Sequence, residues 1–179
     1  MKSVALIVLA LVLTLMFAGC ASHSGGPKVV QGASQAEQEA LLGRVKQLEG
    51  KWAMKAPDGS THVASEFAVS SGGSVVREVM FPGHPHEMTN VYHMDGRELV
   101  MTHYCAVGNQ PRMRAASMQG NRLVFTFESV TNYTGGDQHC MRDMAIEFKD
   151  ADTIVEHWRS YVGDKPSPEV TRFELTRVK

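Results

Sequence analysis

The segment from Met101 to Met113 holds the densest group of chemically capable side chains in the sequence. If residues 99–105 form a strand, alternation places Met101 and His103 on one face together with Leu99 and Cys105. We expect His103 and Arg112 to hold a ligand carboxylate, because binding pockets place a few polar groups in an apolar lining. The alternative is that His103 is a hydrogen-bonded core residue. The predicted ligand contacts are Tyr92, Met101, His103, Asn109, Arg112, Met113 and His157.

A second group of candidates could bind a metal ion. His84 and His86 flank a proline in a short turn, and His93, His103 or His139 could add the third ligand that such a site needs. Methionine is frequent, and thioether sulfur suits Cu(I). Loop histidines and core-filling methionines are the alternative explanation. We therefore expect no resident metal or other cofactor, and keep a copper- or zinc-handling protein as an alternative function.

Catalytic signatures are weak. The sequence contains no Gly-x-Ser-x-Gly motif. Cys105 lies two residues after His103, but such a pair needs a suitable projection and a free thiolate to act as a dyad. No buried carboxylate pair is evident, and alternation points Glu156 away from His157. We do not expect an enzyme.

The N-terminus has the pattern of an export signal. Lys2 precedes a nearly continuous apolar run from Val4 to Phe17, which is shorter than the ~20 residues that span a bilayer. The run ends in Phe17-Ala18-Gly19-Cys20, which resembles the lipobox of bacterial lipoproteins. This resemblance implies cleavage before Cys20, palmitate-type acylation of its thiol and, with Ala21 next, an outer-membrane protein facing the periplasm. The membrane would then be a partner through the lipid.

Two cysteines remain in that oxidising compartment. A disulfide between Cys105 and Cys140 is the economical expectation, and two free thiols or a metal-binding pair are the alternatives.

Length and charge limit the remaining possibilities. After residues 1–19 are removed, residues 20–32 are rich in Ser, Gly and Pro and predict a flexible tether, so that residues 33–179 form one domain. The formal net charge is -1 and there is no block of Lys or Arg, which argues against nucleic acid as a partner.

The elements that must position these residues are one helix and about ten strands. Ser34 and Glu37 form a capping box ahead of an apolar stripe, which predicts a helix over residues 35–48. Short apolar runs then alternate with turn signals to the end of the chain, as in an all-β fold. Short turns between successive runs favour an antiparallel meander, and closure into a barrel removes its edges. A β-sandwich is the alternative.

The helix leads into Leu48-Glu49-Gly50-Lys51-Trp52, and this Gly-x-Trp resembles the opening of the calycin superfamily, the lipocalins and their relatives. The resemblance implies a meander barrel closed at one end by Gly50 and Trp52, with Arg177 packed over the Trp ring. In haem-binding members an axial His lies near the C-terminus, and His157 is the nearest candidate here, but no further haem signature is present. The expected function is a lipid-anchored barrel that binds a small apolar or amphipathic ligand. A structural lipoprotein with a filled barrel is a further alternative.

Overall fold

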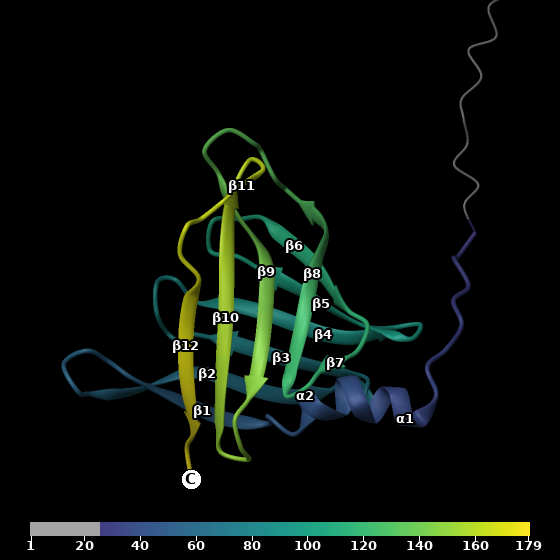
Figure 1. Cartoon of the computed structure of the whole chain (residues 1–179), viewed down its shortest axis with the longest axis horizontal. Coiled ribbons are helices and arrows are strands. Elements are labelled where there is room, and N and C mark those ends of the chain that lie inside the picture. Colours follow the sequence, from purple (N-terminus) through teal and green to yellow (C-terminus); the bar gives the residue numbers. More distant parts are fainter. Residues whose placement is uncertain (1–25) are drawn as a thin grey trace, which may run out of the picture.

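The computed structural model describes residues 26–179 and gives an all-β domain with one short N-terminal helix (Figure 1). The predicted signal, Cys20 and the first part of the tether lie outside the described residues. The helix begins after Ser34, whose hydroxyl accepts a hydrogen bond from the backbone N–H of Glu37 at 3.3 Å, so the predicted capping box is present. It continues as α1 (Gln35–Gln38), a π-helical stretch η1 (Glu39–Gly43) and α2 (Arg44–Lys46).

Twelve strands follow, of which ten form the barrel wall and two contain only two residues each. The wall strands are β1 (Gly50–Lys55), β2 (Thr61–Ser70), β3 (Val75–Met80), β4 (Met88–Asp95), β5 (Glu98–Tyr104), β6 (Gln110–Ala115), β8 (Arg122–Thr131), β9 (His139–Phe148), β10 (Thr153–Val162) and β12 (Thr171–Arg177). The short strands are β7 (Met118–Gln119) and β11 (Lys165–Pro166), and a 3-10 turn η2 (Ser71–Gly73) joins β2 to β3.

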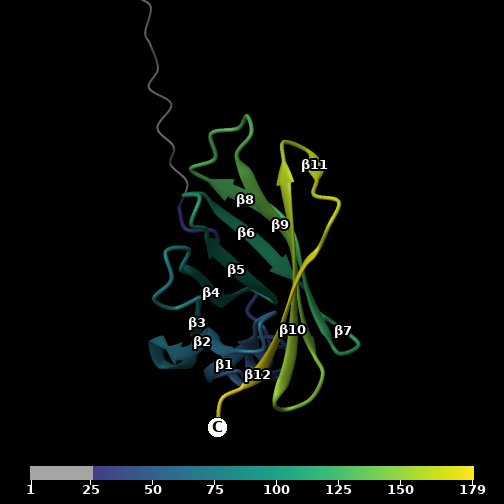
Figure 2. The same ribbon diagram turned by 90° about the vertical axis from the view of Figure 1, so that its left-hand side faces the viewer.

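Each wall strand pairs antiparallel with its neighbours, and β1 pairs with β12 to close the barrel. The closing register sets Trp52 opposite Arg177. Figure 2 shows β10 and β12 crossing steeply over the earlier strands, as the twist of a closed sheet requires. The predicted meander barrel is therefore confirmed, and the sandwich alternative is wrong.

Two short strands interrupt the simple meander. β6 ends at Ala115, and Ala116 and a bend at Ser117 separate it from β7. β11 pairs with the end of β10. Within residues 26–179, no helix is long and apolar enough to cross a membrane.

The helix marks what we call the closed end of the barrel. Leu41, Leu42 and Val45 are buried there, next to the fully buried Trp52. The indole N–H of Trp52 donates to the carbonyl of Leu48 at 2.7 Å. The opposite, open end carries the loops at residues 56–60, 81–87, 105–109, 132–138 and 163–170.

Arg177 contacts both the helix end and β1 at the closed end. Its guanidinium carbon lies 4.4 Å from the ring centroid of Trp52, so the expected cation–π contact is present. The same group donates to the carbonyls of Glu49 at 2.9 Å and Gln47 at 2.7 Å. Gly50 has φ +119°, which a side chain would strain, and so lets the chain turn into β1 beneath this contact.

Candidate functional site

The inner face of β5 has the composition that alternation predicts. Leu99, Met101 and His103 are at most 1% exposed, whereas Tyr104 is 49% exposed on the outside. Met101 lies opposite Met113 of β6, which is also fully buried. His103 therefore points into the barrel interior, and its neighbours there are polar.

Glu78 of β3 is the centre of a buried polar network. Its Oε1 accepts a hydrogen bond from the hydroxyl of Ser65 at 2.7 Å. Its Oε2 accepts from the amide of Asn90 and from the phenol of Tyr92, both at 2.8 Å. All four side chains are at most 1% exposed. A carboxyl that accepts three such bonds behaves as an ionised group, because ionised Glu is an acceptor only.

A second buried carboxyl meets Glu78 from the other side of the barrel. Glu156 of β10 is fully buried, and its Oε2 accepts from the indole N–H of Trp158 at 3.0 Å. Burial, then the charge of Glu78 and a hydrogen bond with Glu78, raise the pKa of Glu156 well above its usual value. Burial and the neighbouring carboxylate therefore both favour the protonated form of Glu156.

His103 is held in one tautomer by the same network. Asn90 donates through its amide nitrogen to Glu78, so its oxygen is free to accept from Nδ1–H of His103 at 2.7 Å. Burial lowers the pKa of His103 to about 4, which leaves the ring neutral. Nε2 then carries a lone pair, and within the described residues this buried atom has no hydrogen-bond partner.

The network closes into a ring of contacts. His103 bonds Asn90, Asn90 bonds Glu78, and Glu78 meets Glu156. Trp158 donates to Glu156, and its ring lies 4.9 Å from the imidazole of His103, centroid to centroid. Buried polar groups cost free energy unless they are paired. A barrel interior filled with apolar side chains would avoid this cost.

The other predicted ligand contacts divide into two groups. Tyr92, Met101 and Met113 face the interior with His103. Arg112 lies on the outer face of the sheet, where it contacts Glu128 at 2.7 Å and Asp95 at 3.4 Å. The expectation that Arg112 and His103 hold one carboxylate is therefore wrong, since adjacent positions of the paired strands β5 and β6 send them to opposite faces.

His157 and Asn109 also lie apart from the network. His157 is on the outer face of β10, where its Nε2 lies 3.1 Å from Glu147. Asn109 is fully buried in the open-end loop, and its amide donates to the carbonyl of His139 at 2.8 Å. That bond fixes the loop 105–109 against the start of β9.

Cys105 and Cys140 are both free thiols in the structure, so the predicted disulfide is not formed there. Cys140 is buried, and that burial is the main cause of its raised pKa.

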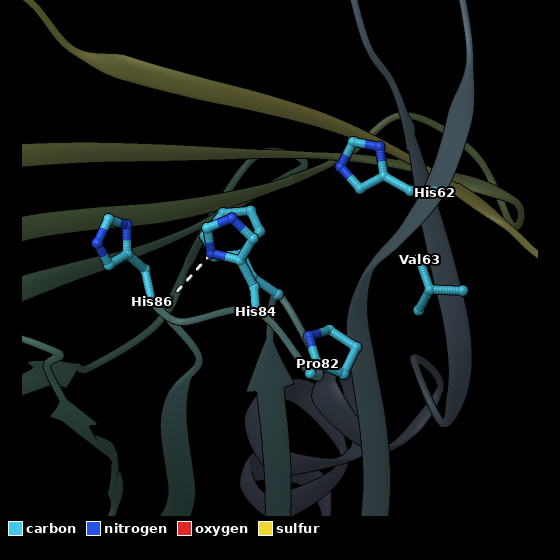
Figure 3. A pocket seen from close by; sticks show the side chains of 7 residues that line it. His62, Val63, Pro82, His84 and His86 are labelled. Carbon is cyan, nitrogen blue, oxygen red and sulfur yellow. Dashed lines mark hydrogen bonds between the residues drawn. The ribbon is translucent and has the colours of Figure 1, made fainter.

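A pocket of about 560 Å³ lies at the open end, between the start of β2 and the loop 81–87 (Figure 3). Its size falls within the ~300–1,000 Å³ typical of small-molecule sites. Figure 3 shows the imidazoles of His62, His84 and His86 around this space. The remaining lining residues are Val63, Phe81, Pro82 and Gly83.

Phe81 connects this pocket to the barrel interior. It directly follows Met80, whose sulfur contacts Asn90 of the network at 3.3 Å. The Phe81 ring packs against the core and lies 5.3 Å from the ring of Phe173. Its φ of +54° is unusual for a bulky residue, and such backbone strain is concentrated at functional sites.

The loop histidines are hydrogen-bonded to their own loop. The backbone N–H of His86 donates to Nδ1 of His84 at 3.1 Å, and the two rings are 5.4 Å apart. Neither His93, His103 nor His139 lines their pocket, whereas His62 does. Among residues 26–179, no three His, Cys, Asp or Glu side chains are arranged to hold a metal ion.

The sequence prediction missed Glu78, Asn90 and Glu156. The alternation of side chains along a strand could have identified them, because Glu156 lies on the same face of its strand as Ile154 and Trp158, which are both buried. Glu78 likewise lies between the buried Val76 and Met80. The expectation of no buried carboxylate pair is wrong, since the two carboxyls come from strands 78 residues apart that face each other only in the closed barrel.

No protein-family model matches this sequence, and no curated protein matches it.

Proposed function

We propose that this chain is a lipid-anchored envelope protein whose barrel binds a small amphipathic molecule at its open end. The observation that carries the proposal is the open-end pocket with the strained Phe81 in its lining. The apolar part of the ligand would contact Val63, Phe81 and Pro82, and its polar part would reach hydrogen-bonding groups.

The barrel interior supports this function better than a purely structural one. A structural barrel is most stable with apolar side chains, because buried polar groups without partners cost about 1–3 kcal/mol each. Here the interior holds two buried carboxyls and an imidazole nitrogen that lacks a partner within the described residues. Interiors that are polar at this cost are typical of binding sites.

The envelope location is proposed from the sequence, since its signal and Cys20 lie outside the described residues. The first described residues support a particular orientation. Gln31 lies against the turn between β4 and β5, where a Cβ added to Gly96 would be 3.0 Å from its carbonyl oxygen. The chain therefore leaves the domain at the closed end, so that a lipid on Cys20 would leave the open end facing away from the membrane.

Extraction of the protein from membranes, followed by mass spectrometry of bound small molecules, tests the proposal. We expect a co-purifying amphipathic molecule in near-stoichiometric amount. Val63→Trp fills part of the pocket and should reduce that amount about tenfold, since a blocked contact of this kind costs ~1–3 kcal/mol.

Val170→Trp is the matched control, because it places the same bulk at an exposed position outside the pocket. Bound ligand should be unchanged in this variant. A protein that carries no small molecule in any of the three forms, and binds no added amphiphile, would contradict the proposed function.

A further inference from the structure

We infer that the ring of Glu78, Glu156, His103, Asn90 and Trp158 binds the ammonium group of an amphipathic primary amine. The inference rests on the proposed function and names the polar group of its ligand. Nothing in the predicted ligand set required a cation, since Arg112 and His103 were expected to hold an acid.

The charge of the network is the first argument. Glu78 accepts three hydrogen bonds as an ionised carboxylate, and the neutral groups Ser65, Asn90 and Tyr92 supply all of them. In the described part of the chain, none of the ion pairs includes Glu78 or Glu156. A buried charge is costly unless it is paired, and a cationic ligand would pair it.

Acceptor geometry is the second argument. A primary ammonium has three N–H donors. Nε2 of His103 and Oε1 of Glu156 are both buried and lack partners among the described donors. Oε1 is the oxygen of Glu156 that the indole of Trp158 does not use, so it can accept an N–H of the ammonium while Glu156 keeps its proton. His103 would accept a further N–H, which its fixed tautomer allows.

The same features exclude other polar groups. A carboxylate or phosphate would face Glu78 without any cation to meet it, so that an acidic ligand is repelled. A bound metal ion would need three converging ligands, which the described residues do not provide. An alcohol could bond His103 but would leave the charge of Glu78 unpaired.

To reach the pocket, the alkyl part of the amine would displace flexible core side chains. Four buried methionines share the interior with the network, and their flexible thioether side chains rearrange at low cost. They are Met80, Met101, Met113 and Met144. Met80 leads directly to Phe81 at the pocket, so an amine bound at Glu78 would extend its chain toward the open end.

Calorimetric titration of the purified protein with octylamine, octanol, octanoate and octyltrimethylammonium tests the inference. Octylamine should bind at least about tenfold more tightly than octanol, because a hydrogen bond to a charged group adds ~1.5–3 kcal/mol. Octanoate should bind most weakly. Octyltrimethylammonium carries the charge without N–H donors and should fall between octylamine and octanol.

Two variants locate the binding. Glu78→Gln removes the charge and should lower the octylamine affinity about tenfold while leaving that for octanol within about threefold. Glu169→Gln, an exposed change on the β10–β12 connection, should alter neither affinity. If Glu78→Gln does not fold, the ranking of the four probes on the unaltered protein still decides the question.

Equal binding of octylamine and octanol would overturn the amine assignment while leaving the proposed ligand-binding function in place. Tightest binding of octanoate would also overturn it, in favour of an acidic ligand. If none of the four probes binds and no ligand co-purifies, the proposed function fails together with the inference.

Discussion

The protonation states of a few buried residues determine the charge of the barrel interior. Glu156 is buried with its pKa raised, and His103 is buried with its pKa lowered to about 4. Both shifts favour the neutral forms of these groups. The carboxylate of Glu78 accepts hydrogen bonds from Ser65, Asn90 and Tyr92, which are neutral donors.

These shifts predict how stability depends on pH. In the unfolded chain, Glu156 ionises near its ordinary pKa of 4.5. The lowered pKa of His103 makes its contribution to the free energy of unfolding rise between about pH 4 and 6.5. Above pH 6.5 this contribution stays constant. We therefore expect the Glu156 contribution to the free energy of unfolding to fall as pH rises above 4.5, by up to about 1.4 kcal/mol per pH unit, until its raised folded pKa is passed.

Glu156→Gln removes the titrating group and should flatten this part of the profile, as measured by urea unfolding at several pH values. Glu169→Gln is the exposed control and should keep the slope. Parallel profiles for the unaltered protein and Glu156→Gln would show that Glu156 is ionised in the folded state, contrary to our description.

Among the elements, the closed end is the part that the sequence predicts best. The capping box, the Gly-x-Trp and the terminal Arg are local signals, each tied to one conformation, and all three are present. Strand positions were also predictable, because the runs are bounded by turns that contain Gly, Pro, Asn or Asp. The polar network was not predictable from the sequence, since its members lie on five strands and meet only after the barrel closes.

Arg177 joins the last strand to the end of the helix and to β1, so its loss should loosen three elements together. Arg177→Met removes three hydrogen bonds to carbonyls, an ion pair with Asp152 and the contact with Trp52. We expect it to lower the free energy of unfolding by about 2 kcal/mol. On the same strand, Arg172→Met breaks only an exposed pair with Glu174 and should cost less than about 0.5 kcal/mol. Chemical denaturation of both variants measures the difference, and equal losses would contradict this role of Arg177.

At the scale of the whole molecule, the two ends of the barrel have separate tasks. The closed end is packed by the helix and receives the N-terminal segment, whereas the open end carries the pocket. The ten residue steps from Cys20 to Val30 can span at most about 35 Å. A lipid on Cys20 would therefore hold the barrel close to a membrane with its open end outward.

The anchor itself is testable by fractionation. Cys20→Ser should move the protein from the membrane fraction to the soluble periplasmic fraction, because several acyl chains supply the proposed membrane affinity. Cys105→Ser is the matched control and should stay in the membrane fraction. A Cys20→Ser variant that remains membrane-bound would mean that something other than the lipid attaches the protein.

The position of a bound amine shows directly whether the proposed site lies inside the barrel. Carboxyl ¹³C NMR of glutamate-labelled protein, with and without octylamine, reports on each carboxyl separately once Glu78→Gln and Glu156→Gln assign the signals. We predict that octylamine shifts the signals of Glu78 and Glu156 and leaves those of exposed glutamates such as Glu169 unchanged. Shifts confined to exposed glutamates, with both interior signals unmoved, would contradict a binding site inside the barrel.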